Sequence, residues 1–217
     1  MTTVYVAWAV SALVLILAAG WAGRAASAAK NPLRILVDSR GRYSLSQLQI
    51  VLWTIVVLSL LAGVFIARLF HAVPNPLDIT IPDEVLIVMG ISIGSATAAG
   101  AIKASKDMKG TSQKVLQARF SQTFTEEGEG DDDIVDITKF QNLWLTLIVI
   151  AAYVVSAINY IGTKTDPGAL NALPGFNGTL LTLLGISHAG YLAGKLPDKK
   201  SPALRSAPPG DVDQGKK

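Results

Sequence analysis

Five apolar stretches, each close to the length that crosses a lipid bilayer, dominate this 217-residue chain. A membrane-spanning helix needs about 20 predominantly apolar residues. The stretches cover residues 4–20, 50–67, 85–102, 143–161 and 179–194. Hydrophobic residues make up 50% of the chain and charged residues only 16%, which is a composition outside the usual soluble range. The sequence therefore predicts an all-α integral membrane protein with five transmembrane helices.

The positions of the basic residues predict the orientation of these helices. Of the 19 Lys and Arg residues, 17 lie in residues 24–45, 103–139 and 195–217, and cytoplasmic segments of membrane proteins are enriched in Lys and Arg. We therefore expect the N-terminus outside and the C-terminus in the cytoplasm, with no need for a nucleic-acid partner to explain the positive charge. Because Arg24 and Lys30 follow the first apolar stretch and no basic residue precedes it, we expect that helix to remain uncleaved.

Two short motifs, 92 positions apart, open the second and fourth apolar stretches. Each motif has a hydroxyl residue three positions before a glutamine, namely Ser46 with Gln49 and Thr138 with Gln141. This spacing is typical of a capping box, in which the hydroxyl and the glutamine side chains bond to free backbone N–H groups at a helix start. The motifs predict the points at which two helices enter the bilayer.

The same motifs indicate an internal duplication. The sequence Gly-Ile-Ser at 90–92 recurs at 185–187, so a helical hairpin of about 60 residues is expected twice. Each hairpin starts and ends in the cytoplasm, which makes the last four helices two parallel-oriented hairpin repeats. We expect a pseudo-two-fold axis along the membrane normal to relate them.

This interpretation divides the chain into six parts, of which the last is a tail with too little apolar content to fold. They are a first transmembrane helix (1–23), a cytoplasmic segment (24–45), the first hairpin (46–102), a charged cytoplasmic loop (103–137), the second hairpin (138–195) and a disordered cytoplasmic tail (196–217).

A longer pattern within residues 34–195 resembles a family. It reads Asp38-x-x-Gly41-Arg42-Tyr43-Ser44-x-Ser46-x-x-Gln49, then Leu52-Trp53-Thr54, and later Leu184-Gly185-Ile186-Ser187 before a short Lys-containing tail. In these features the chain is similar to a group of uncharacterised small bacterial multi-pass membrane proteins. The second copy departs from the pattern, because Asp131 to Asp133 lack the glycine. The resemblance implies the fold and a location in the bacterial inner membrane, and it implies no activity.

Polar side chains within the predicted spans are the first candidates for function. His188 is the only basic residue among them and no acidic residue occurs, which disfavours an ion-coupled transporter. The candidates for pore lining or for contacts between helices are Ser92, Ser95, Thr97, Asn159, Ser187 and His188. Three roles are open for His188: a neutral imidazole bonded to a neighbouring helix, a pore-lining or proton-responsive group, and a metal ligand.

Small residues on the third and fifth helices predict close helix packing. Small residues at a spacing of four let two helix backbones approach in a membrane. The candidates are Gly90, Gly94, Gly185 and Gly190. We expect these faces to support a homo-oligomer.

Outside the bilayer, a run of acidic residues is a weak candidate for contact with a partner or a cation. It contains Glu126, Glu127, Glu129, Asp131, Asp132 and Asp133. Such a run is most often a solvated linker. The chain has no cysteine and no recognisable catalytic motif, so we expect no enzymatic activity, no cofactor and no bound metal.

These observations favour a non-enzymatic membrane anchor or scaffold. In this interpretation, residues 103–137 and the C-terminal tail contact a cytoplasmic protein partner. The alternative is an oligomeric channel or pore for ions or small solutes, lined by the third and fifth helices.

Overall fold

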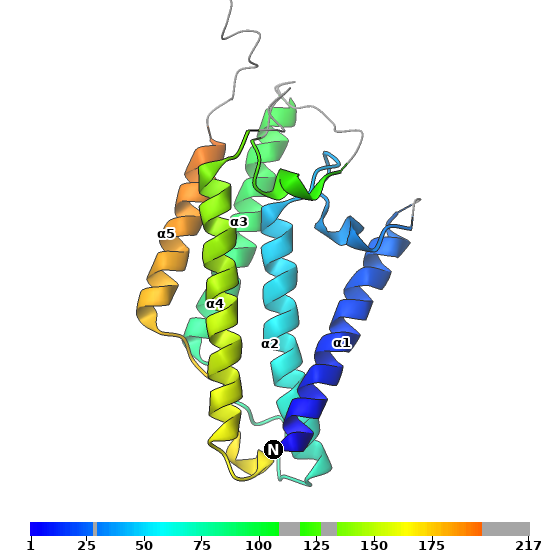
Figure 1. The fold of residues 1–217 in the computed structure, drawn as a ribbon, viewed down its shortest axis with the longest axis vertical. Coiled ribbons are helices and arrows are strands. Elements are labelled where there is room, and N and C mark those ends of the chain that lie inside the picture. The colour runs from blue at the N-terminus through cyan, green and yellow to red at the C-terminus, as the bar shows by residue number, and fades with distance from the viewer. Residues whose placement is uncertain (28–29, 109–117, 127–133, 197–217) are drawn as a thin grey trace, which may run out of the picture.

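The computed structural model is an all-helical bundle, and it describes residues 1–27, 30–108, 118–126 and 134–196. Five helices, seen in Figure 1, run roughly along the long axis of the molecule. They are α1 (Thr2–Ala25), α2 (Leu45–Phe70), α3 (Asp83–Met108), α4 (Ile137–Gly162) and α5 (Gly178–Lys195). Short 3₁₀ turns cover Pro32–Leu36, Phe120–Thr123 and Pro167–Ala169. The described residues form isolated β-bridges but no β-strand.

Four of the helices, α1 to α4, are long and apolar enough to cross a membrane. With 24 to 26 residues each, they exceed the roughly 20 residues that a span needs. These helices define the chain as a multi-helix protein of the membrane class. The fifth predicted stretch is helical, but α5 has only 18 residues and rises about 27 Å. A count of five spans therefore stays a prediction.

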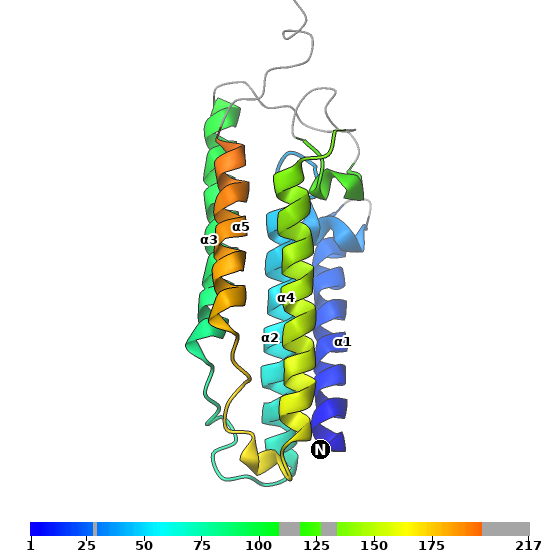
Figure 2. The ribbon, with the colours of Figure 1, turned by 60° about the vertical axis from the view of Figure 1, so that its left-hand side comes forward.

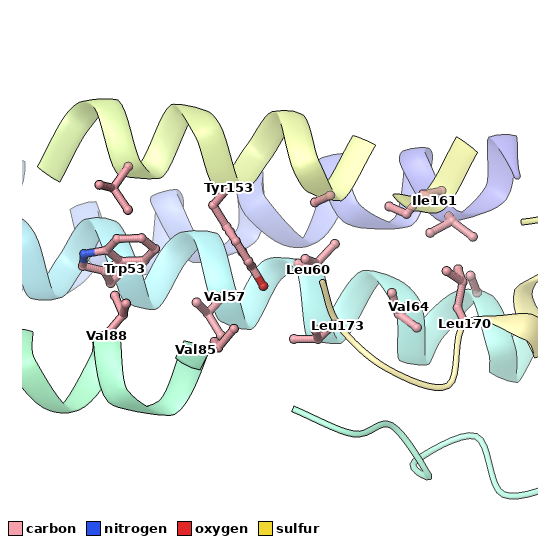
Figure 3. Packing of buried hydrophobic residues seen from close by; sticks show 14 of the residues in the cluster. Trp53, Val57, Leu60, Val64, Val85, Val88, Tyr153, Ile161, Leu170 and Leu173 are labelled. Atoms are coloured by element: carbon pink, nitrogen blue, oxygen red, sulfur yellow. The ribbon is translucent and has the colours of Figure 1, made fainter. Parts of the chain in front are cut away.

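An extended segment makes up for the short α5. Leu170 and Leu173, which precede α5, are 0% and 3% exposed. Phe176 stacks on Tyr153 of α4, with 4.6 Å between the ring centroids. Irregular backbone is tolerated at membrane depth only where protein covers it. The segment is thus a structural part of the bundle interior, as Figure 3 shows for its two leucines.

The two hairpins, α2–α3 and α4–α5, lie side by side. Besides the contacts within each hairpin, α2 packs on α4 and α3 packs on α5, and Figure 2 shows α3 and α5 together in one layer. The four helices therefore form a ring in the order α2, α3, α5, α4. A two-fold axis along the bundle would place α2 opposite α4 and α3 opposite α5. In the observed ring these helices are neighbours, so the described helices do not show the predicted two-fold axis, and the duplication itself stays a prediction.

The predicted capping boxes are wrong. Helix α2 begins at Leu45 after the N-cap Ser44, and α4 begins at Ile137 after the N-cap Asp136. The predicted caps Ser46 and Thr138 thus lie inside the first turns. Gln49 and Gln141 are two residues too far along the helices to close a capping box. The helices start earlier because a short antiparallel bridge, Val37 with Tyr43 or Thr125 with Val135, ends just before each N-cap.

Helix α1 packs closely against α2 along one face. A Cβ atom on Gly63 of α2 would lie 2.6 Å from the Cα atom of Trp8, so only glycine allows this approach. The indole Nε1 of Trp8 donates to the hydroxyl of Ser59, at 3.1 Å. The opposite face of α1, including Val10 and Leu17, is exposed, as expected for a face turned to lipid.

The interior divides into two halves along the bundle axis. We call the end at which α2 and α4 begin the entry end, and the end with residues 71–82 and 163–177 the turn end. Toward the turn end the core is apolar. It contains Val57, Leu60, Val64, Ala157, Ile161, Leu170 and Leu173, each 3% exposed or less, most of which are labelled in Figure 3.

Arg68 fixes the loops at the turn end. Its guanidinium is buried and donates to the carbonyls of Asp78 and Leu170, at 2.8 and 2.9 Å. Thr80 and Ala172 form a parallel bridge between the same two loops. The two hairpins are therefore joined at their turns as well as along their helices.

Candidate functional site

The entry half of the bundle has a polar interior. The side-chain Nε2 of Gln49 on α2 donates to Asn142 Oδ1 at 3.1 Å and to Thr146 Oγ1 at 2.7 Å, both on α4. All three residues are fully buried. Hydrogen bonds of this kind link membrane helices and are each worth on the order of 1 kcal/mol. Gln49 is therefore an interhelical contact residue that the capping interpretation missed.

Two further polar pairs hold α5 against the first hairpin. Ser95 Oγ of α3 lies 2.7 Å from His188 Nδ1, and Ser46 Oγ of α2 lies 2.9 Å from the hydroxyl of Tyr191. Of the three roles open for His188, this geometry supports the bond to a neighbouring helix. The nitrogen Nε2 of His188 has no hydrogen-bond partner among the described residues.

The six predicted pore-lining or contact residues do not share a surface. Ser92, Ser95, Ser187 and His188 are 2 to 6% exposed and lie inside the chain. Thr97 faces outward and donates to the carbonyl of Ile93 at 2.9 Å, and Asn159 is also exposed. Of the six, only Ser95 and His188 bond to each other.

The predicted packing glycines separate into two groups. Within 4 Å of a Cβ built on Gly90, Gly94 or Gly190 the structure places no atom, so these glycines open to the outside of the bundle. A Cβ on Gly185 would lie 3.9 Å from Ile91 of α3, which is ordinary packing. The close helix contact is at Gly63 instead. Ser59 and Ala67 lie four residues to either side of Gly63, so the same small-residue spacing on α2 was the signal that the sequence reasoning missed.

At the entry end, charged side chains hold the soluble segments onto the helix ends. We call residues 36–44, 118–126 and 134–136 the platform. Arg40 of the platform donates to the carbonyl of Lys103 at the end of α3, and Arg42 donates to the carbonyl of Glu126, both at 2.9 Å. Lys139 of α4 reaches the carbonyl of Thr125 at 2.8 Å. A side chain bonded to a distant backbone carbonyl fixes that backbone, so the platform and the bundle are one folded unit.

The turn inside the platform is built on Asp38. Its Oδ1 accepts from the backbone N–H of Arg40 and of Arg42, at 3.0 and 3.1 Å, and its Oδ2 pairs with Lys103 Nζ. Gly41 adopts φ 83°, a left-handed conformation that favours glycine. The ion pair joins the platform to α3.

Most of the predicted acidic contact residues lie outside the described part of the chain. They are Glu127, Glu129, Asp131, Asp132 and Asp133. Glu126 belongs to the platform, where its N–H donates to the carbonyl of Ile134 at 2.8 Å. The chain thus leaves the platform at Glu126 and returns to it at the adjacent Ile134. In the described ranges, no group of three His, Asp or Glu residues is placed to hold a metal ion.

A cavity of about 250 Å³ lies between the start of α2 and the last turns of α3. Its lining includes Ser44, Ser46 and Gln47 on one side and Lys103 on the other. Asp38 and Ser39 of the platform also line it, as do small residues of α3 at helical spacing, namely Ala96, Ala99, Gly100 and Ala104. The small residues of α3 therefore leave space against α2 at this point.

Comparisons of the chain with protein-family models, with curated proteins and with solved structures find no match.

Proposed function

We propose that this chain is a non-enzymatic multi-pass protein of the bacterial inner membrane that serves as an anchor or scaffold. The bundle holds the platform at the cytoplasmic surface. The platform in turn presents to a cytoplasmic protein partner the chain segments that extend from it. The observation that carries the proposal is the attachment of the platform to two helix ends. Arg40 and the ion pair between Asp38 and Lys103 join the platform to α3, and Lys139 joins it to α4.

The division of the interior supports an anchor over a conduit. The polar contacts between α2 and α4 lie in the entry half, and the core of the turn half is closed by apolar residues that are almost fully buried. The buried Arg68 at the turn end bonds to loop carbonyls. Four of the six candidate pore residues are buried inside the chain, so they are not available to line an axis shared by several copies. The pore alternative has no such observation in its favour.

The orientation and the duplication are parts of the proposal. Gathering the starts of α2 and α4 and the ends of α3 and α5 at one end, as in Figure 1, fits a cytoplasmic entry end with its many basic residues. For the duplication, support comes from the helix bounds: α2 and α4 begin 92 positions apart and also end 92 positions apart, and α3 and α5 begin 95 apart.

Self-association is the remaining part. Gly90 and Gly94 open to the outside of α3, one turn apart. This placement fits a helix contact between copies of the chain, because small residues at that spacing allow close backbone approach in lipid.

Site-specific cross-linking in membranes tests the anchor proposal. A photoreactive residue is placed at Ile134 on the platform and, as a comparison, at Leu77 in the turn end, positions that are 46% and 76% exposed. We expect a discrete adduct with a protein from position 134 and none from position 77. Equal adducts at both positions, or none at 134, would contradict the proposal.

A second variant asks whether the folded platform is what the partner contacts. The double substitution Arg42→Ala with Lys139→Ala removes one bond inside the platform and one that attaches it to α4. We expect it to reduce the adduct from position 134 at least fivefold at an unchanged membrane level. Arg34→Ala is the matched control, because Arg34 lies at the same end and forms hydrogen bonds only through its backbone within the described chain.

A further inference from the structure

The start of α2 lacks the polar cap that a helix N-terminus needs. The first N–H groups of a helix have no partner within the helix. At α2, the N–H groups of Leu45, Ser46 and Gln47 have no acceptor among the described residues, and the hydroxyl of the N-cap Ser44 makes no capping bond. This helix end therefore presents free donors and the positive end of the helix dipole.

The equivalent position in the second hairpin shows what is missing. Asp136 lies 92 positions after Ser44 and is the N-cap of α4. Its carboxylate Oδ1 accepts from the N–H of Thr138 at 3.0 Å and of Lys139 at 3.3 Å. An anion thus satisfies the start of α4, whereas the start of α2 has only a serine.

The 250 Å³ cavity lies at this uncapped start. Ser44 lines it although the residue is only 6% exposed, and its side chain makes no capping bond. Gln47 Oε1, on the same wall, is buried and has no hydrogen-bond partner in the described chain. A cavity with unused donors and an unused acceptor is suited to a small polar ligand.

The charges around the cavity favour an anion. Lys103 Nζ uses one of its three donors on Asp38, which leaves two for a ligand. The carboxylate of Asp38 is already occupied by Lys103 and by the N–H groups of Arg40 and Arg42. Lys103 therefore supplies the positive charge and the unused donors that a negative group entering the cavity meets.

We infer that the cavity binds a phosphate-type anion that also carries an O–H or N–H donor. The anion accepts hydrogen bonds from the first N–H groups of α2, from the hydroxyl of Ser44 and from Lys103, and the ligand donor bonds to Gln47 Oε1. It does at α2 what the Asp136 carboxylate does at α4. The same chemistry is supplied by inorganic phosphate in solution and by the phosphate of a phospholipid headgroup, and the inference goes beyond the anchor proposal.

Thermal unfolding of the full chain distinguishes the two sources. The protein is measured in a sugar-based detergent with increasing inorganic phosphate, with sulfate, which lacks a donor at neutral pH, as the comparison. It is then measured in nanodiscs of phosphatidylethanolamine and of a glycolipid without phosphate. We expect a Tm rise of roughly 5 °C at saturating ligand from phosphate or from the phospholipid, and a smaller one from sulfate. A Tm that responds to neither phosphate source overturns the inference.

Ser44→Asp supplies the missing carboxylate from the chain itself. We expect this variant to have a higher Tm than the wild type without phosphate and to lose the response to the active source. Gln141→Glu is the control, because it adds the same charge at an exposed position near the start of α4, and it should keep the wild-type response. Lys103→Met should weaken the response at least tenfold in apparent affinity, and a full response in Ser44→Asp would overturn the assignment.

Discussion

The two hairpins have matching helix bounds but different surroundings. Helices α2 and α4 each have 26 residues and keep one register over their whole length. Yet α2 is enclosed by α1, α3 and α4, whereas α4 keeps a face open. Position 63 of α2 is a buried glycine against α1, and position 155 of α4, its equivalent, is a valine that is 56% exposed.

The difference shows that the neighbouring helices determine the burial and bonding of a residue, even where positions 92 residues apart carry the same residue type. Gln49 is 0% exposed and bonds to α4, while its equivalent Gln141 is exposed. A two-fold axis would turn Gln141 toward α2 just as Gln49 is turned toward α4. In the observed ring, the face of α2 that meets α4 corresponds, 92 positions later, to a face of α4 that is exposed at Gln141. The two glutamines follow that rule.

The largest expected effect separates the two hairpins at positions 63 and 155. Gly63→Val adds a Cβ that would lie 2.6 Å from the Trp8 backbone, and because backbone does not yield as a flexible side chain does, α1 is forced away. We expect a loss of more than about 3 kcal/mol in stability, since overpacking usually costs 1–3 kcal/mol where side chains can adjust. Thermal unfolding in mild detergent measures it.

Val155→Leu is the matched change on the second hairpin. It also adds volume, but on the exposed face of α4, so we expect a change within about 0.5 kcal/mol. Equal Tm values for the two variants would show that α1 does not pack on α2 as described.

A smaller effect is expected from the two glutamines. Gln49→Leu leaves the buried Asn142 and Thr146 without the donor that joins them to α2. We expect a loss of about 1 to 2 kcal/mol, because unpaired buried polar groups are costly. Gln141→Leu should change stability by less than about 0.5 kcal/mol. If Gln141→Leu cost as much as Gln49→Leu, the observed ring of helices would be contradicted.

The sequence was enough to predict the helical class and the positions of the helices. Apolar length and periodicity are local properties, and the four long apolar helices α1 to α4 follow from them. The roles of Ser46 and Gln49 were not predictable in the same way. A hydroxyl three residues before a glutamine fits a cap or an interhelical contact equally well, and the choice depends on where the preceding bridge ends and on which helix lies opposite.

Contacts that depend on distant segments gave no sequence signal. Arg68 acquires its role from the turn-end loops and belongs to no spaced motif. Gly63 does lie in a small-residue pattern with Ser59 and Ala67, but that pattern does not say which helix packs against it. The uncapped start of α2 is different, because a comparison of Ser44 with Asp136 reveals it once the register of 92 is accepted. The two glutamines, Gln49 and Gln141, indicate this register of 92 residues, although they do not cap their helices.

The smallest effect on stability is expected at the equivalent glycines of α3 and α5, which lie 95 positions apart. No atom lies within 4 Å of a Cβ on Gly90, while a Cβ on Gly185 meets Ile91 of α3. Gly90→Leu should therefore change the free energy of unfolding of the monomer by less than about 0.5 kcal/mol. Gly185→Leu should lower the stability, because it disturbs the contact of α3 with α5. Thermal unfolding measures both variants.

If copies of the chain associate through the open face of α3, Gly90→Leu also abolishes the oligomer in size-exclusion chromatography with light scattering, whereas Gly185→Leu retains it. An unchanged oligomer in Gly90→Leu would place any self-association on another surface. A lowered Tm in the same variant would show that the chain itself covers this face of α3.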